Sequence, residues 1–277
     1  MTYCVGIKTH AGLVFLSDSR TSAGMDSIAS FRKALVYEQP GERFMTLLSA
    51  GNLSISQCVR EILQSETLPA EDGGEPLTIW NARSMYDAAR VLGEAIRRVR
   101  ARDGAALAQD NIEFNASFIF GGQIKGEPMR LFLVYAAGNF IEATCETPFF
   151  QIGESKYGKP VLDRVITPDT PLDEAAKCAM VSMDSTLKSN LSVGLPLDLV
   201  IYASDALRSE KIVCIDEHNA YWQMLRADWG ARLRAVFDGI EDPVWDAAAK
   251  NVATPLMVPA AGHAALRKIV SPEDPSS

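Results

Sequence analysis

The pattern of apolar and polar positions predicts a β-hairpin at the very start of the chain. Residues 3–9 and 13–18 are rich in β-branched and aromatic side chains, and His10-Ala11-Gly12 between them is turn material. Two further short β-runs follow at 34–38 and 43–49. The chain is therefore expected to form several strands before any helix.

Helical periodicity begins at residue 52. Four apolar residues share one face of the expected helix, with Asn52 or Ser54 as its N-cap: Ile55, Cys58, Val59 and Ile62. Residues 66–82 are rich in Pro, Gly and Glu and are expected to form an exposed loop. A longer amphipathic helix covers residues 85–99. We interpret its arginine-bearing face as solvated, because the chain is acidic and no aromatic residues interleave with the arginines.

The second half of the chain returns to strands and then to helices. Strands are expected at 114–120, 130–136, 140–145, 149–152, 197–203 and 211–216, with turns at Gly121-Gly122 and Gly138-Asn139. Helices are expected after Gly153, over 170–191 and over 218–237. Strands linked as hairpins, with helices in pairs, do not build a parallel doubly wound sheet. The expected fold is α+β, a four-layer αββα sandwich with two antiparallel sheets between helix layers. It forms one domain over residues 1–240, followed by a C-terminal extension over 241–277.

Composition and charge narrow the functional classes. Apolar residues make up 47% of the chain and charged ones 22%, which excludes intrinsic disorder of the whole chain. The 27 basic and 35 acidic residues leave a net charge of −8, which argues against a nucleic-acid partner. No apolar run reaches the roughly 18 residues of a membrane span, and no secretory signal is evident, so we expect a cytoplasmic protein with no membrane partner. The five cysteines and three histidines are scattered, so the sequence predicts neither a metal nor another cofactor.

The residue after the initiator methionine is the first candidate for chemistry. Thr2 is small enough to favour removal of Met1, which would make it the N-terminus. An N-terminal threonine combines a hydroxyl nucleophile with an α-amine base, whose ordinary pKa is about 8. The amine needs a nearby cation, and the cation needs a carboxylate to hold it. Asp18 ends the partner strand of the hairpin and Lys33 precedes the next strand, so both can return beside Thr2. Taken alone, Asp18 and Lys33 would be an ordinary ion pair at a strand end.

These segments together resemble the opening of proteasome β-type subunits, which are N-terminal nucleophile hydrolases. The resemblance is closest to the bacterial Anbu, or ancestral β-subunit, family. It is carried in order by residues 2–9, 12–20, Lys33 and 49–51, and later by 182–196. It covers roughly residues 2–240.

The resemblance implies roles for particular residues of this chain. Thr2 would be the nucleophile, Asp18 and Lys33 would tune it, and the N–H of Gly51 would bind the oxyanion. Asp184 matches the later aspartate that orients groups around the N-terminal amine. Residues implied for substrate binding are Thr21, Ser49 and Leu53.

The chain also departs from the proteasome pattern. The interval from Thr2 to Lys33 is one residue shorter, so the turn around 25–30 must absorb a deletion. Gly153-Glu154-Ser155 stands where those subunits have Gly-Ser-Gly, so either Glu154 or Ser155 fills the auxiliary catalytic position. Residues 187–189 replace the usual Ser-Gly-Gly.

The leading functional hypothesis is a threonine-type amide hydrolase, a peptidase that acts on a peptide or protein substrate within a self-assembled ring or spiral. The alternatives are an amidohydrolase for a small amide or γ-glutamyl substrate, and a non-catalytic assembly subunit if Met1 is retained. The pocket sets specificity, so fold and nucleophile do not separate the two enzymes. Whether an ATPase works with the chain stays open.

Overall fold

The computed structural model describes residues 2–22, 28–67 and 75–243. The chain divides into two compact units, Met1–Leu233 and Arg234–Ser277. The sandwich described below lies within the first unit. The predicted domain boundary after residue 240 stays a prediction, and most of the predicted extension lies outside the described residues.

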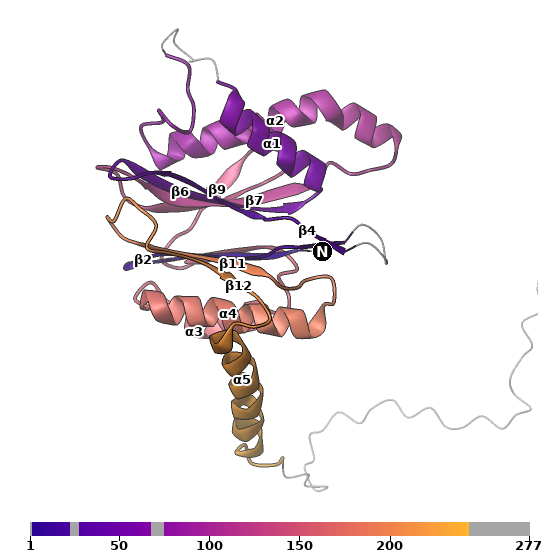
Figure 1. Ribbon diagram of the computed structural model, residues 1–277, viewed down its shortest axis with the longest axis vertical. Coiled ribbons are helices and arrows are strands. Elements are labelled where there is room, and N and C mark those ends of the chain that lie inside the picture. The colour runs from indigo at the N-terminus through magenta and orange to yellow at the C-terminus, as the bar shows by residue number, and fades with distance from the viewer. Residues whose placement is uncertain (1, 23–27, 68–74, 244–277) are drawn as a thin grey trace, which may run out of the picture. The chain divides into compact units, whose positions relative to one another are not determined.

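Two five-stranded antiparallel sheets form the centre of the first unit (Figure 1). One sheet has the order β10-β1-β2-β11-β12 and the other the order β5-β6-β7-β8-β9. The strands of the first sheet are β1 (Tyr3–Thr9), β2 (Gly12–Asp18), β10 (Phe149–Gly153), β11 (Leu197–Ala203) and β12 (Lys211–Ile215). Those of the second are β5 (Ala34–Gln39), β6 (Arg43–Gly51), β7 (Ala116–Ile124), β8 (Arg130–Val134) and β9 (Phe140–Glu142).

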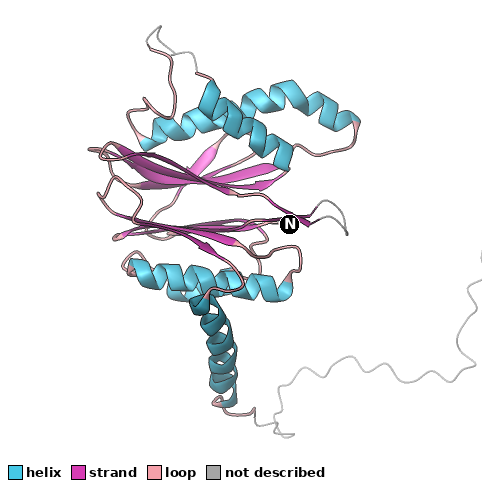
Figure 2. Cartoon of the chain, in the orientation of Figure 1, coloured by secondary structure: helices cyan, strands magenta, loops and turns pink. Residues whose placement is uncertain are grey.

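Helices cover the outer face of each sheet (Figure 2). The helices α1 (Leu53–Ser65) and α2 (Met85–Gln109) lie on the second sheet, and α3 (Lys159–Val165) and α4 (Leu172–Ser189) lie on the first. The helix α5 (Ala220–Asp238) buries Trp222 and Leu225 in the core beneath the first sheet. The predicted four-layer αββα sandwich is confirmed.

Three apolar clusters hold the layers together. One lies between the second sheet and its helices, and another between the first sheet and its helices. The third lies between the two sheets and contains the fully buried Phe15, Leu48 and Ile119. Alternation along β1 explains the division, because Tyr3 and Val5 face the helices while Cys4 faces the other sheet.

One local expectation needs correction, and one small element was not predicted. Gly121-Gly122 is not a turn but lies inside β7, where Gly122 pairs with Met45 of β6. A Cβ at Gly122 would lie 2.0 Å from the carbonyl oxygen of Phe44, so glycine permits close approach of the two backbones. A small two-stranded sheet also follows β2, formed by β3 (Arg20–Ser22) and β4 (Ile28–Ser30). Such short strands carry too few residues for an alternating pattern to be visible.

No helix in residues 2–22, 28–67 and 75–243 is long and apolar enough to cross a membrane. The cytoplasmic location stays a prediction.

The inter-sheet core generates a stability prediction. Phe15 is fully buried against Gly6 and Gly121, so Phe15→Ala should lower the free energy of unfolding by about 3–5 kcal/mol. Leu191, which is 90% exposed, supplies the control, and Leu191→Ala should cost no more than about 0.5 kcal/mol. Urea unfolding at one fixed protein concentration measures both. Equal midpoints for the two variants would contradict this account of the core.

Candidate active site

The β1–β2 hairpin places Asp18 beside the first residues of the chain. Cys4 of β1 pairs with Ser17 of β2, so the last residue of β2 lies next to the beginning of β1. The N–H of Tyr3 donates to Oδ1 of Asp18 at 3.0 Å. The Asp18 carboxylate therefore lies directly behind Thr2, as the hairpin pattern predicted.

Lys33 completes a buried ion pair at this position. Its Nζ donates to Oδ1 of Asp18 at 2.7 Å and to the carbonyl oxygen of Arg20 at 2.6 Å. The two ionised side chains are only 7% and 0% exposed. Burial raises the pKa of the Asp18 carboxyl, and the Lys33 ammonium partly opposes that rise. The ion pair is therefore held at a desolvation cost.

A pocket of about 460 Å³ opens at this pair. Five of the predicted site residues line it: Thr2, Lys33, Ser49, Gly51 and Leu53. They come from segments far apart in the sequence, namely the residue before β1, the segment before β5, the end of β6 and the first turn of α1. The other lining residues are Arg20, Ala50, Ser56, Asn115, Ser117 and Gly153. The structure thus brings the predicted nucleophile, cation and oxyanion donor to one cavity.

The N-terminal end of α1 also points to this pocket. Asn52 caps the helix, with its Oδ1 accepting the N–H of Ser54 at 3.0 Å, which decides between the two predicted N-caps. Leu53 and Ser56 of the first turn line the cavity. The partial positive charge of a helix N-terminus favours negative charge nearby.

The backbone of Thr2 is held by the strand on its other side. Gly153 ends β10 opposite Tyr3, with a φ of +82°. A Cβ at Gly153 would lie 2.0 Å from the carbonyl oxygen of Thr2, so only glycine fits there. The N–H of Glu154 donates to the same carbonyl oxygen at 2.7 Å. These contacts fix the main chain of Thr2.

The side chains of Glu154 and Ser155 lie away from the pocket. The Glu154 carboxylate accepts from Nδ2 of Asn190 at 3.2 Å, whereas Ser155 lines a separate hollow with Lys159 and Asp163. Neither residue is among those that line the Thr2 pocket. Glu154 therefore reaches Thr2 through its backbone, and the choice between the two residues for an auxiliary role stays a prediction.

The structure does not bring Asp184 to Thr2. Asp184 lies on α4, and its Oδ1 accepts from Nε of Arg226 on α5 at 2.8 Å. It lines a different hollow, between α4 and α5. Ser182, two residues earlier, is the α4 residue that reaches the start of β1, through a hydrogen bond with the hydroxyl of Tyr3. We therefore assign Asp184 no part in the site.

Thr21 lies in β3, opposite Ala29 of β4. Its side chain lies outside the described part, so its role in substrate binding stays a prediction.

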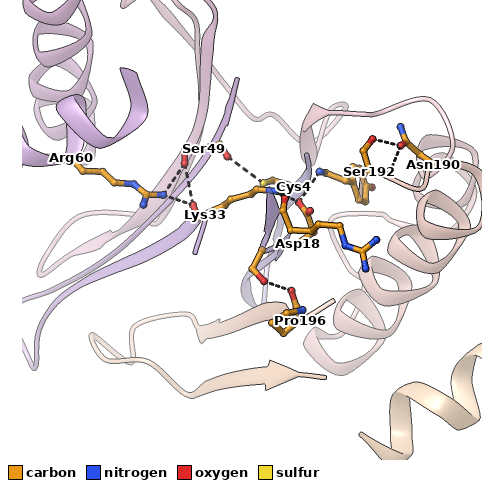
Figure 3. Close-up of polar contacts among 11 residues, drawn as sticks. Cys4, Asp18, Lys33, Ser49, Arg60, Asn190, Ser192 and Pro196 are labelled. Atoms are coloured by element: carbon orange, nitrogen blue, oxygen red, sulfur yellow. Dashed lines mark hydrogen bonds and ion pairs between the residues drawn. The ribbon is translucent and has the colours of Figure 1, made fainter. Parts of the chain in front are cut away.

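The sequence did not reveal two polar contacts around the site. Gln151 donates from Nε2 to the Tyr3 hydroxyl at 2.6 Å, beneath β1. Arg60 of α1 reaches Ser49 and the backbone of Lys33 (Figure 3). No pattern in the sequence indicated these contacts of Arg60, which lies on the side of α1 that also carries Leu53 and Ser56. Within residues 2–22, 28–67 and 75–243 no cluster of His, Cys, Asp or Glu could hold a metal ion.

Because the Asp18–Lys33 pair is desolvated, removing one partner should cost more than removing both. Asp18→Asn keeps an acceptor for Tyr3 but leaves the Lys33 ammonium without a counter-charge, at about 3–5 kcal/mol of unfolding free energy. Adding Lys33→Met should bring the double variant within about 2 kcal/mol of the parent.

Urea unfolding of the two single variants and the double variant measures this cycle. The half-exposed pair Lys159–Asp163 is the control, and Asp163→Asn should cost less than about 1 kcal/mol. A double variant no more stable than Asp18→Asn would show that the pair is not desolvated as described.

No protein-family model matches the chain, and no curated protein does either. Solved structures do match. A structure of Anbu (ancestral beta-subunit) from Yersinia bercovieri is 48% identical over 88% of this chain and 100% of that chain, with a TM-score of 0.80. Anbu from Hyphomicrobium sp. strain MC1 is 48% identical over 87% and 99% of the two chains, with a TM-score of 0.79.

A third solved structure is described as a helical assembly of the Anbu complex from Pseudomonas aeruginosa. It is 47% identical over 88% of this chain and 98% of that chain, with a TM-score of 0.80. At this identity and coverage, the chain resembles these proteins in sequence as well as in fold. This chain belongs to the Anbu (ancestral β-subunit) family.

Proposed function

We propose that this chain is a threonine-type amide hydrolase that cleaves peptide or protein substrates, with Thr2 as its N-terminal nucleophile once Met1 is removed. The observation that carries the proposal is the buried Asp18–Lys33 pair at the wall of the Thr2 pocket.

A buried ion pair is weak support for stability, because desolvation of both charges offsets their attraction. An exposed pair at a strand end would need no further explanation. Here Lys33 is only 6% exposed and still lines a cavity together with a hydroxyl residue. Charged groups held against desolvation in a pocket are typical of catalytic sites.

The chemistry follows from the residues at the pocket. The Thr2 hydroxyl attacks the amide carbonyl of the substrate, and the free α-amine of Thr2 accepts the hydroxyl proton. The same proton then passes to the leaving amine, which leaves an ester on Thr2. Water, deprotonated by the amine, attacks the ester and releases the acid, which restores the Thr2 hydroxyl. The Lys33 ammonium supplies a positive charge beside the reacting groups.

The negative charge that develops on the carbonyl oxygen needs donors. The proposal assigns this role to the N–H of Gly51, supported by the N-terminal end of α1. Such a donor typically lowers the barrier by about 3 kcal/mol. Ser49 and Leu53 line the same cavity and are assigned to substrate binding.

We propose further that the chain works as a self-associated ring or spiral. The relative from Pseudomonas aeruginosa forms a helical assembly. Several large apolar side chains of this chain are also exposed, namely Ile212, Met224 and Leu233. Packing against further copies would remove such surface from water. The apolar stretch 255–261, whose burial the sequence also favours, lies outside the described residues.

The nucleophile proposal predicts both the mass of the chain and its reactivity. The purified protein should lack Met1, and a β-lactone should acylate Thr2, as located by tandem mass spectrometry. Lys33→Ala should lower the labelling rate by about 100-fold or more. Lys33→Arg should be nearly as slow, since a guanidinium does not fit the position of an ammonium.

Thr2→Ala, which removes the nucleophile, is the control for labelling elsewhere. An unlabelled chain that retains Met1 would favour the non-catalytic assembly subunit. Labelling of Lys33→Ala at the parent rate would make Lys33 structural only. If Thr2 is acylated, the chain is then tested on a peptide library and on a set of small γ-glutamyl amides. Cleavage of the peptides favours the peptidase, and cleavage of the small amides favours the amidohydrolase.

Self-association predicts a particle much larger than the 30.2 kDa chain. Light scattering coupled to gel filtration at micromolar concentration should report many copies. Leu233→Glu, at an exposed apolar position, should shift the distribution toward smaller species. A stable monomer of the parent chain would contradict the proposal.

A further inference from the structure

The residue that carries the proposed cation lies outside regular structure. Residues 31–33 form the link between β4 and β5, and β5 begins only at Ala34. The backbone of this link is nevertheless held in place. The carbonyl oxygen of Lys33 accepts the N–H of Ser49 at 3.1 Å, which joins the link to β6.

A single side chain of α1 supplies most of the remaining contacts. Nη1 of Arg60 donates to the carbonyl oxygen of Arg32 at 2.9 Å, and Nη2 donates to that of Lys33 at 3.1 Å. Nη2 also donates to Oγ of Ser49 at 2.8 Å. In Figure 3 the Arg60 side chain extends toward Ser49 and Lys33. One guanidinium thus joins two consecutive carbonyls of the link to a wall residue of the pocket.

These contacts do not serve to pair the charge of Arg60. None of the described carboxylates forms an ion pair with Arg60, and burial lowers the pKa of its guanidinium. A partly buried cation without a counter-charge carries a desolvation cost. Among the residues that the structure describes, hydrogen bonds to the link and to Ser49 are the contacts that offset this cost.

The helix also places Arg60 on the appropriate face. Leu53, Ser56 and Arg60 are spaced i, i+3 and i+7 and share one side of α1. Leu53 and Ser56 line the pocket, and Arg60 continues the same face toward the Lys33 backbone. The helix whose N-terminal end faces the site therefore also holds the backbone of the lysine.

We propose that Arg60 is a positioning residue that fixes the main chain of Lys33 relative to Ser49 and so aligns the Lys33 ammonium with Thr2. The proposal rests on the proposed hydrolase function. A planar guanidinium binds two carbonyls and a hydroxyl at once, which the compact ammonium of lysine does not reproduce. A shift of about 1 Å at a reacting group can cost about 100-fold in rate.

Arg43 provides a matched control. It begins β6, the strand that carries Ser49 near its other end, and its Nη1 also donates to two backbone carbonyls, those of Ile79 and Ala82. Arg43, Ile79 and Ala82 do not line the Thr2 pocket. Arg43→Lys therefore removes a similar main-chain contact at the far end of the same strand.

The experiment compares Arg60→Lys, Arg43→Lys and the parent chain in β-lactone labelling of Thr2 over a range of lactone concentrations. Arg60→Lys should lower the maximal labelling rate by about 10- to 100-fold, with the half-saturating concentration changed by less than about 3-fold. Arg43→Lys should stay within about 2-fold of the parent in both. Circular dichroism checks folding, and Arg60→Gln replaces any Arg60→Lys sample that does not fold.

Hydrogen exchange of the same proteins separates this inference from the proposed function. The Ser49 amide donates to the Lys33 carbonyl, so its exchange should be at least about 10-fold faster in Arg60→Lys than in Arg43→Lys. If the parent labels and Arg60→Lys labels equally fast, Arg60 is not a positioning residue. If the parent does not label at all, the hydrolase proposal is wrong. In that case, Ser49 exchange in Arg60→Lys that equals the exchange in Arg43→Lys would also reject the role of Arg60 in holding the Lys33 backbone. Faster exchange in Arg60→Lys would show that Arg60 holds this backbone without any part in catalysis.

Discussion

The ion pair between Asp18 and Lys33 is the interaction on which the rest of the site depends. Removing a carboxylate and an ammonium from water costs several kcal/mol for each ion, and their attraction recovers this only with good geometry. Burial raises the pKa of Asp18 even with Lys33 at 2.7 Å, so desolvation outweighs the attraction of the ammonium at that carboxyl. Replacing a buried ion pair by well-packed apolar side chains is often neutral or stabilising. The charges therefore call for a functional reason, and the proposed activation of Thr2 supplies one.

The fold limits the cost of these charges by supplying partners from the backbone. The hairpin turns Asp18 toward the N–H of Tyr3, and the Arg20 carbonyl accepts from Lys33. Tyr3 lies across the hairpin from the strand that Asp18 ends, and Arg20 follows Asp18 by two residues. The inter-sheet core keeps water from the far side of the pair, because Cys4 and its neighbours there are fully buried. Stability of the sandwich is thus a condition for keeping the ion pair dry.

Sequence patterns predicted the parts of the site that depend on short-range geometry. Asp18 follows from the hairpin, since its strand length and turn length fix which residue returns beside Thr2. Asp184 illustrates the opposite case. Ser182 and Asp184 are two residues apart, so about 200° of helical rotation separates them, and only the packing of α4 decides which one faces β1. Arg60 was missed for the same reason, because its contacts depend on how α1 lies across the second sheet.

Backbone groups make up much of the site, so few side chains are needed to define its chemistry. Thr2, Arg20 and Lys33 each offer a carbonyl oxygen that holds the site together, accepting respectively from Glu154 N–H, Lys33 Nζ and Arg60. Any residue type provides such an acceptor, so these contacts place no requirement on the side chains at these positions. The side-chain donors, Lys33 and by the same argument Arg60, must keep their chemistry, and the proposed mechanism requires the side chains of Thr2 and Asp18 as well. Side-chain motifs therefore identify only part of a site that backbone groups from many segments complete.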